Sequence, residues 1–529
     1  MTENGSGRHL ELTVNGHTHV VPDRGDTLLD VLRYDLGLMS VKDGCSPQGQ
    51  CGCCTVLVDG QPRVACVTPA RRVRRREITT VEGLSAGRAD LWGAALCASG
   101  GSQCGFCTPG IVLRLEASTD KVVAEPDRDA VKAVADQALL AHMCRCTGWQ
   151  TITDAFEAVV GEQDVTVPEQ SADRARRILL EGGTAQEMTP ASALGVGGFA
   201  ADTPPAGHLV ALIDADGAWV VGETISEARA LSGKVQGRRT TIDHHYPVAM
   251  PEGEDFVAGF QTTWTDPAYL ETDASWCAPG GEPRSALGNG GAFGGKTGGE
   301  IEAAAKALCE VHGRPVLALF SREDVMRRAP KRPPFGGGVR EDGSGRVRFA
   351  ASEGIEELVA TYAPEFELET VTVAGPPTGL GHRAAGWAEL AILRSAVTDP
   401  QGPIRVESPN GAVATADTID GGLRITVSAG PVLNSDSFTS YCIGAAHMGW
   451  SWATSEAMTV DEAGEIHDLT VRSLGILRAV DTPAITVELI DDPSTAARNG
   501  SDAVFAAAAA LAWRRHAFGR RWPLGTQAL

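Results

Sequence analysis

The start of the chain carries two different hydrophobic periodicities. Residues 9–14 and 17–21 alternate between hydrophobic and polar side chains, and the dipeptide Asn15-Gly16 between them is typical of a tight turn. Residues 27–33 instead repeat their hydrophobic positions with helical spacing. The pattern predicts a β-hairpin followed by a short helix, within a small β-rich unit.

Helical and strand-like patterns alternate through the rest of the chain. Residues 108–143 have apolar side chains at helical spacing, and residues 172–181 predict one helix within an otherwise polar segment. Further on, β-branched runs such as 209–213 mix with helical stretches such as 301–311 and the alanine-rich 506–514. We therefore expect a protein of the α+β class.

The 529 residues are too many for a single hydrophobic core, so several domains are expected. We place a β-rich domain at 1–86 and a helical domain at 87–165. A linker at 166–194 then leads to a mixed region at 195–529, which we expect to form two lobes that divide near residue 400.

Composition narrows the possible partners. The formal net charge of −21 argues against nucleic acid or an anionic membrane as the main partner. We see no signal peptide after Met1 and no run of eighteen apolar residues that could span a bilayer. A cytoplasmic location is expected.

One basic run stands out against this acidic background. Residues 71–76 contain five arginines. Nucleic-acid binding fits poorly with so acidic a chain, which leaves a solvated turn or a docking surface for an acidic redox partner.

The cysteines are clustered, with ten of the thirteen in the first 146 residues. Cys104 and Cys107 form a CxxC pair, and Cys144 and Cys146 form a CxC pair. Four thiolates from two short loops can close a tetrahedral sulfur site, which suits zinc or an iron–sulfur cluster. Buried structural thiols are the alternative, but they have no reason to fall in such pairs.

A second group lies in a loop rich in glycine, whose backbone N–H groups can point at sulfur. Its members Cys45, Cys51, Cys54 and Cys66 follow a plant-type ferredoxin pattern, with C-x5-C where C-x4-C is usual. We attribute the extra residue to an insertion near Ser46. A four-cysteine zinc site is the rival reading.

With both groups in view, residues 8–165 resemble the iron–sulfur module of the xanthine dehydrogenase/aldehyde oxidase family, the molybdenum hydroxylases. The matching motifs are Gly49-Gln-Cys51-Gly, Gln103-Cys-Gly-Phe-Cys-Thr-Pro-Gly110 and Cys144-Arg-Cys-Thr-Gly148. The resemblance implies a β-grasp ferredoxin domain and a four-helix domain, each with one [2Fe–2S] cluster. It also implies that Gln103 and Cys146 approach a molybdopterin, and that the Cys45 cluster lies farther from it.

The region from 195 resembles a shortened, divergent molybdopterin-binding subunit of the same family. The similarity rests on blocks in a shared order: 266–271, 290–296, 313–324, 432–436 and 443–456. The resemblance implies that the cofactor contacts the residues Gln103, Gly290, Gly291, Phe293, Gly294 and Gly295. No flavin (FAD) domain fits in the short segment 166–194, so electrons are expected to leave to a flavin subunit or a soluble acceptor.

Departures from the family are equally informative. Only eighteen residues separate Glu271 from Gly290, and they contain no glutamine, although the family places a molybdenum-contacting glutamine there. Ser501 stands where the family has its catalytic glutamate. Asp502 is the remaining candidate base, and a helix N-cap is its alternative role; no other catalytic residue can be assigned.

Two functions follow as expectations. The first is an iron–sulfur oxidoreductase chain that passes electrons from a molybdopterin site, shared with or housed in a partner, to an external acceptor. The second is a non-catalytic electron-transfer or assembly scaffold whose C-terminal half has lost molybdopterin binding. Zinc in both cysteine groups, without a redox role, is a third and weaker reading.

Overall fold

The computed structural model describes residues 9–123, 127–234, 242–253, 255–285, 291–399 and 401–526. Its N-terminal domain is a five-stranded sheet of the β-grasp type. The strands are β1 (His9–Val14), β2 (His17–Pro22), β3 (Thr55–Val58), β4 (Gln61–Val64) and β5 (Glu77–Thr79), in the order β2-β1-β5-β3-β4. The predicted helix forms as α1 (Leu28–Asp30), which continues as a π-helical turn over Val31–Asp35. Short 3₁₀ turns lie at Ala65–Val67, Ala70–Val73 and Val81–Gly83.

This domain confirms the predicted hairpin. β1 and β2 are antiparallel across the turn at Asn15, and their inward residues Leu10, Leu12 and Val14 are buried. The helix face of Leu28 and Leu32 packs on the same core.

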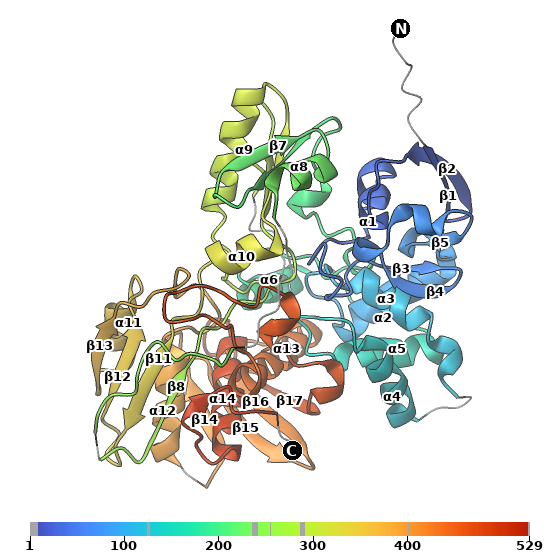
Figure 1. The fold of residues 1–529 in the computed structure, drawn as a ribbon. Helices are drawn as coiled ribbons and strands as arrows, with labels where there is room; N and C mark the ends of the chain where they lie inside the picture. Colours follow the sequence, from blue (N-terminus) through green and yellow to red (C-terminus); the bar gives the residue numbers. More distant parts are fainter. Residues whose placement is uncertain are drawn as a thin grey trace.

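The second domain is built from four helices. They are α2 (Ala86–Ser99), α3 (Thr108–Glu116), α4 (Arg128–Leu139) and α5 (Gln150–Val160), with a 3₁₀ turn at Thr119–Lys121. Trp92 of α2 and Phe156 of α5 stack with ring centroids 6.2 Å apart at its centre. Figure 1 shows this bundle directly beneath the β-grasp domain.

The predicted linker at 166–194 contains a helix that packs against the C-terminal region. Its helix α6 (Ala172–Gly182) matches the expected 172–181, and it packs against the long helix α13 (Ser435–Thr454). Arg174, Arg177 and Glu181 of α6 are almost fully buried. The short helices Pro190–Ala193 (α7) and Ala200–Asp202 then lead into the C-terminal region.

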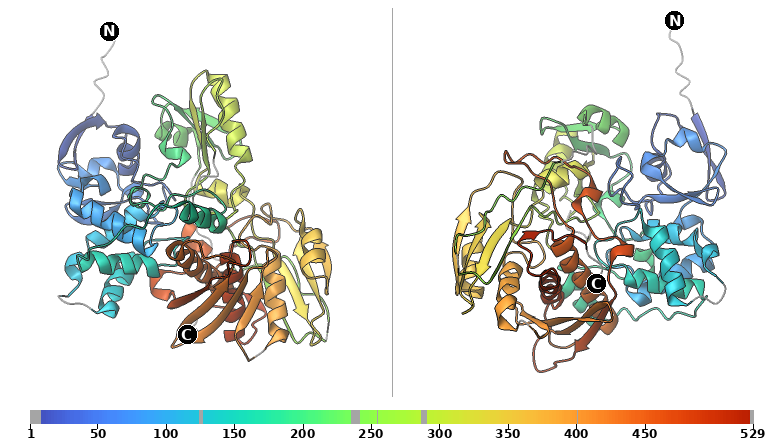
Figure 2. Two further views of the ribbon diagram at one scale, coloured as in Figure 1. Left: turned by 180° about the vertical axis from the view of Figure 1, so that it is seen from behind. Right: turned by 60° about the horizontal axis from the view of Figure 1, so that its bottom comes forward.

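The described residues after 195 contain three sheets, where we had expected two lobes. The first has the order β7-β6-β10-β9, and its elements are β6 (Leu209–Ile213), β7 (Trp219–Gly222), α8 (Ile225–Ser232), β9 (Ala274–Cys277), α9 (Gly299–His312), β10 (Val316–Leu319) and α10 (Arg322–Arg328). The predicted strand 209–213 and helix 301–311 are confirmed as β6 and α9. Figure 2 shows this lobe standing beside the β-grasp domain.

The second sheet crosses the expected division near 400. Its elements are β8 (Ala258–Thr262), β11 (Phe335–Val339), β12 (Gly345–Ala350), α11 (Ile355–Tyr362), β13 (Phe366–Val371), α12 (Trp387–Thr398) and β18 (Arg521–Trp522). Because β18 near the C-terminus pairs with β8, the two halves are interleaved. The boundaries of independently folding units stay a prediction.

The third sheet packs against the two longest C-terminal helices. Its elements are β14 (Ile404–Glu407), β15 (Val413–Ile419), β16 (Gly422–Ser428), α13, β17 (Ile485–Ile490) and α14 (Ser501–Arg515), with 3₁₀ turns at Val471–Leu474 and Ala479–Asp481. α13 and α14 lie side by side and are buried along nearly their whole length, so this helix pair forms the centre of the molecule (Figure 1). The mixed sheets and helices confirm the α+β class. No helix among the described residues is long and apolar enough to cross a membrane.

Candidate functional site

The first cysteine group is held by the loop between α1 and β3 and by the turn after β4. The backbone N–H groups of Gln50 and Cys51 each donate to Cys45 Sγ at 3.3 Å, and the N–H of Cys66 donates to Cys54 Sγ at 3.4 Å. All four thiols are buried. The neighbouring thiols of Cys51, first, and of Cys66 lower the pKa of Cys45 well below that of a free cysteine, because they donate to its thiolate. Backbone donors of this kind also stabilise the negative charge of sulfur in a cluster.

The second group comes from the loops before α3 and α5. The Sγ atoms of Cys104 and Cys146 are 3.6 Å apart. The pKa of Cys144 is lowered to about 6, first by the Cys107 thiol and further by hydrogen bonds from Thr147, whose Oγ1 lies 3.1 Å from Cys144 Sγ. All eight predicted ligands are buried, and the contacts described between them stay within the two groups expected from the sequence. The assignment of individual cysteines to iron stays a prediction.

The two groups are joined directly through the backbone. The N–H of Met143, beside Cys144, donates to the carbonyl of Cys51 at 3.0 Å. A Cβ on Gly110 of α3 would lie 2.4 Å from the carbonyl oxygen of Gly52, so the helix and the first loop are in contact at a glycine. Neither contact could be read from the spacing of the cysteines.

The second group also faces the C-terminal region. Gln103 Nε2 donates to the Cys146 carbonyl at 3.2 Å and to Ser440 Oγ of α13 at 3.0 Å. A Cβ on Gly291 would lie 2.6 Å from Cys146 Sγ. Because glycine has no Cβ, the backbone at residue 291 can lie directly against this sulfur atom. Gly290, predicted beside it, lies outside the described residues.

The other predicted cofactor residues contact the protein itself. The Arg383 guanidinium carbon lies 3.9 Å from the centre of the Phe293 ring. A Cβ on Gly294 would lie 1.8 Å from the Gly381 carbonyl oxygen, and one on Gly295 would lie 2.6 Å from Pro267. Close backbone packing thus accounts for these two glycines. Their contact with a cofactor stays a prediction.

Buried polar atoms near this junction provide a test of whether a polar cofactor fits. Within the described part of the chain, Gln103 Oε1, the Tyr441 hydroxyl and both ring nitrogens of His382 have no hydrogen-bond partner. Leaving such atoms unsatisfied in the interior is costly, so this donor and acceptor set suits a polar organic group. Tyr441 and His382 were missed from the sequence because neither belongs to a recognisable motif.

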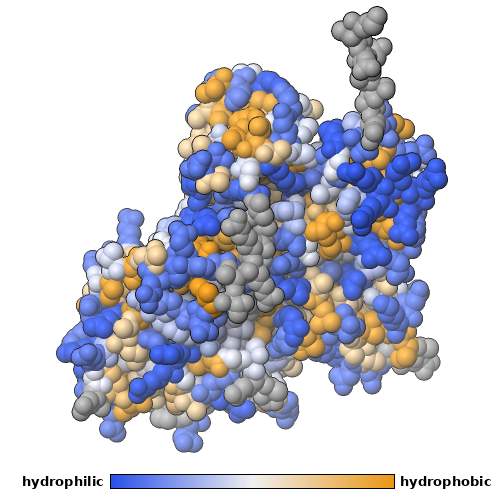
Figure 3. Space-filling model, viewed as in Figure 1, coloured by the Kyte–Doolittle hydropathy of each residue, from blue (hydrophilic) through white to orange (hydrophobic). Residues whose placement is uncertain are grey.

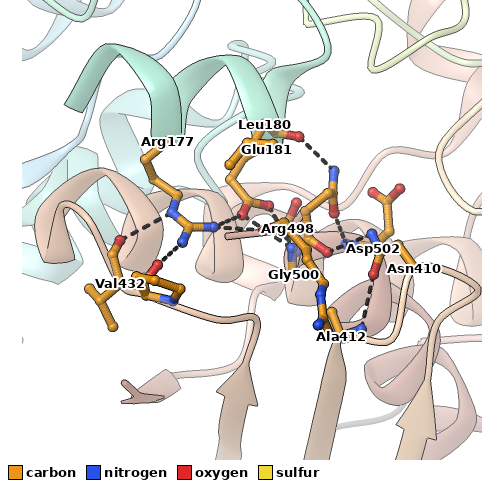
Figure 4. Close-up of polar contacts among 12 residues, drawn as sticks. Arg177, Leu180, Glu181, Asn410, Ala412, Val432, Arg498, Gly500 and Asp502 are labelled. Carbon is orange, nitrogen blue, oxygen red and sulfur yellow. Dashed lines mark hydrogen bonds and ion pairs between the residues drawn. The ribbon is translucent and has the colours of Figure 1, made fainter. Parts of the chain in front are cut away.

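The start of α14 is the position predicted to hold the catalytic base (Figure 4). α14 begins at Ser501 after Gly500, so Asp502 lies in the first turn and the N-cap role suggested for it is wrong. The Asp502 carboxylate instead lies 3.3 Å from Nε of Arg383. Burial raises the pKa of Asp502, and Arg383 opposes that shift.

A different carboxylate satisfies the first backbone N–H groups of α14. Glu181 of the linker helix accepts from the N–H of Gly500 at 3.1 Å and from that of Ser501 at 2.9 Å. Arg177, one helical turn earlier, donates to Glu181 at 2.8 Å and to the carbonyls of Val432 and Arg498 at 3.1 and 2.8 Å. Both side chains of this ion pair are fully buried. The i,i+4 spacing of Arg177 and Glu181 was the only signal of this pair in the sequence.

An interdomain ion pair fixes the second cysteine loop. Arg145, between Cys144 and Cys146, donates to both carboxylate oxygens of Glu456 at 2.6 and 2.9 Å. The same guanidinium donates to the Pro267 carbonyl at 3.0 Å. The helical domain and the C-terminal region are therefore joined beside the predicted ligands.

Comparison with known proteins explains both cysteine groups. A family model described as a 2Fe-2S iron-sulfur cluster binding domain matches residues 12–77, and one described as a [2Fe-2S] binding domain matches residues 80–157. For the cysteines within these residues, the matches support iron–sulfur binding over the alternative of zinc binding.

Two sequence relatives each match somewhat more than a quarter of this chain. The small FeS subunit of nicotinate dehydrogenase from Eubacterium barkeri is 37% identical over 153 residues, which are 28% of this chain and 94% of the relative. The iron-sulfur-binding subunit of xanthine dehydrogenase from Escherichia coli O157:H7 is 39% identical over 151 residues, which are 27% of this chain and 89% of the relative.

Structural similarity extends over almost the whole chain. The aldehyde oxidoreductase of Desulfovibrio gigas superposes with a TM-score of 0.71 over 98% of this chain and 99% of that chain, at 16% identity. At that identity the C-terminal half shares the fold alone. Together with the two matched domains and the subunit-length relatives, this shows that the chain belongs to the xanthine dehydrogenase/aldehyde oxidase family of molybdenum hydroxylases.

Proposed function

We propose that this chain is the iron–sulfur electron-transfer component of a molybdenum hydroxylase-type complex. Electrons would pass from a molybdopterin site, shared with or housed in a partner, through the Cys104 group and then the Cys45 group to an external acceptor. Two of the relatives are named as iron–sulfur subunits, which supports a molybdenum or flavin partner subunit for this chain as well.

The observation that carries the proposal is the contact between the two cysteine loops. The hydrogen bond from Met143 N–H to the Cys51 carbonyl links the loop of Cys144 to a residue of the first group. On the opposite side, Gln103 and Cys146 meet α13 and Gly291 of the C-terminal region. This order supports a path that enters at Cys104 and Cys146 and leaves through the β-grasp domain.

The chain's own residues supply part of a cofactor site. Gln103 would present Oε1, which has no partner among the described residues, to the pterin, and the Gly291 backbone would border the site beside Cys146. When bound, molybdopterin supplies the two-electron oxidation of a C–H bond. Tyr441, with its unpartnered hydroxyl, would orient a polar edge of the same group.

The alternative, a non-catalytic scaffold, draws on the start of α14. Ser501 cannot act as the family's carboxylate, and both oxygens of Glu181 are used by backbone N–H groups and Arg177. A carboxylate whose two oxygens already accept hydrogen bonds in this way is a poor proton acceptor. This chain would then move electrons without oxidising a substrate itself.

The test is to purify the chain anaerobically, alone and with the proteins that co-purify with it. Visible absorption and iron and sulfide content report the clusters, while molybdenum and pterin analysis report the cofactor. Two clusters with molybdopterin in either preparation support the proposal. Two clusters without molybdopterin in either preparation support the scaffold, and absence of iron contradicts both.

A further inference from the structure

The molecule carries a basic surface beside the first cysteine group. Five arginines lie within residues 71–76, and Arg71, Arg72, Arg74, Arg75 and Arg76 are all exposed. Within the described residues, the side chains of Arg71, Arg72, Arg74 and Arg75 form no hydrogen bond or ion pair, whereas Arg76 pairs with Asp59 at 3.1 Å. Four cationic groups are therefore free for a partner, on a chain whose net charge is −21.

The backbone presents these arginines outward. Arg75 adopts a φ of 60°, a left-handed conformation in which glycine is favoured. Two acidic groups lie close to the run along the chain: Asp59 pairs with Arg76, and Glu77 accepts from the N–H of Gly16. The five arginines outnumber these two carboxylates, so the run keeps a net positive charge.

Val67, just before the arginine run in the chain, lies against the ligand loop of the first cysteine group. Val67 follows Cys66 directly and is 48% exposed. A Cβ on Gly49 of the loop would lie 2.9 Å from Val67 Cγ1, so Val67 covers the loop. An exposed apolar side chain four residues before a run of arginines is suited to a brief encounter, in which charge guides the approach and a small dry contact follows.

Part of this loop is already covered by the C-terminal region. The Gly44 carbonyl accepts from Arg322, and Gln48 donates to the Leu469 carbonyl at 2.7 Å, both in the C-terminal region. Figures 1 and 2 show the strands of the β-grasp domain on its far side from that region, and Figure 3 shows a strongly hydrophilic surface there. The Cys66 side carries the exposed Val67 and is therefore accessible to a partner.

We propose that the surface formed by Val67 and the arginines of 71–76 is the docking site of a soluble one-electron carrier with an acidic face. The inference rests on the proposed function, since it names the acceptor of the same electron path. One electron leaves the reduced [2Fe–2S] cluster of the first group and reduces the oxidised carrier. No covalent bond forms or breaks.

The experiment mixes dithionite-reduced, desalted holoprotein with an oxidised probe in a stopped-flow spectrometer. Cytochrome b5 serves as the acidic probe, cytochrome c as the basic one, and ferricyanide as the small acceptor. We expect the second-order rate with cytochrome b5 to fall about tenfold or more between low and high salt, because screening removes electrostatic steering. The rate with cytochrome c is expected to lack this fall.

Paired variants locate the effect. Arg72→Glu/Arg74→Glu is expected to lower the low-salt rate with cytochrome b5 about tenfold and to remove its salt dependence. Arg515→Glu/Arg520→Glu makes the same charge change at exposed arginines near the C-terminus and is expected to leave the rate unchanged. Arg72→Gln/Arg74→Gln should give an intermediate rate and replaces the glutamate variant if that one does not load clusters.

The outcomes separate the two proposals. Normal cluster spectra and fast ferricyanide reduction, with equal effects of both glutamate pairs on cytochrome b5, would show that the run is only a solvated turn and overturn the docking site. Tighter binding of a DNA duplex than of cytochrome b5 at this surface would overturn it as well. Failure to load clusters at all would instead remove the proposed function and the docking site with it.

Discussion

Glu181 and Ser501, 320 positions apart in the chain, are joined by a 2.9 Å hydrogen bond from the Ser501 backbone N–H to the Glu181 carboxylate. The linker helix thereby places a negative charge at the positive end of the α14 dipole. Arg177 Nη1 donates to Glu181 Oε1 at 2.8 Å and so neutralises that charge. A segment that could have been a flexible connection is instead an internal part of the C-terminal core.

This pair predicts a large stability effect. Glu181→Gln should lower the free energy of unfolding by about 3–5 kcal/mol, because it leaves Arg177 charged and buried without its carboxylate. Urea unfolding of the holoprotein measures the change. The matched control is Asp136→Asn, which breaks an i,i+4 pair with the largely exposed Lys132 and should cost about 0.5 kcal/mol or less. Equal effects of the two substitutions would refute a structural role for the buried pair.

The two cysteine groups predict separable magnetic signals. The reduced protein should give two [2Fe–2S] EPR signals, and Cys104→Ser should abolish one of them while sparing the other. The control is Cys309→Ser, a buried cysteine of α9 far along the chain from both groups, which should keep both signals. Loss of both signals in Cys104→Ser, in a protein that still folds, would contradict the assignment of two independent groups.

The start of α14 predicts weak catalysis by the isolated chain. General-base assistance contributes roughly 10²- to 10⁴-fold to a rate. Ser501 stands in place of the expected glutamate, and Asp502 beside it pairs with Arg383. The chain loaded with molybdopterin should therefore not hydroxylate purines, aldehydes or N-heterocycles at rates typical of the family. A substrate panel with a dye acceptor measures this. Rapid turnover that disappears in Asp502→Ala would show that Asp502 had taken over as the base.

Glu271 predicts a pH dependence of stability. Its carboxyl is buried against Lys296 Nζ at 2.6 Å, and burial raises its pKa from 4.5 to about 7 although Lys296 opposes the shift. The native state thus binds more protons than the unfolded state between these values, so this group's stabilising contribution falls as the pH rises through the window. The slope should reach about 1.4 kcal/mol per pH unit.

Chemical unfolding between pH 4.5 and 7 measures that slope, which Glu271→Gln should remove. The control Glu223→Gln changes an exposed carboxyl and should leave the slope unchanged in this range. A parent protein whose stability rises across the window, with no difference in Glu271→Gln, would show that Glu271 ionises normally in the folded state.

Local pattern alone determined much of this protein. The hairpin at 9–22, the linker helix at 172–182 and the strand at 209–213 each follow from a periodicity that depends on neighbouring residues. The cysteine spacing likewise predicted two metal–sulfur sites, because such a site needs several thiolates on short loops. The resemblance of the surrounding motifs predicted iron–sulfur clusters, and the two matched domains confirm iron–sulfur binding.

The tertiary structure alone decided which distant groups meet. Hydrophobic period shows that a residue is buried but not what it is buried against, so the contacts of Glu181 with α14 and of Arg145 with Glu456 could not be inferred. The pairing of β18 with β8 is also invisible locally, and it links the two halves that we expected to divide near residue 400. These partners are chosen by long-range packing, in which each buried charge and each backbone donor needs a group supplied from elsewhere in the chain.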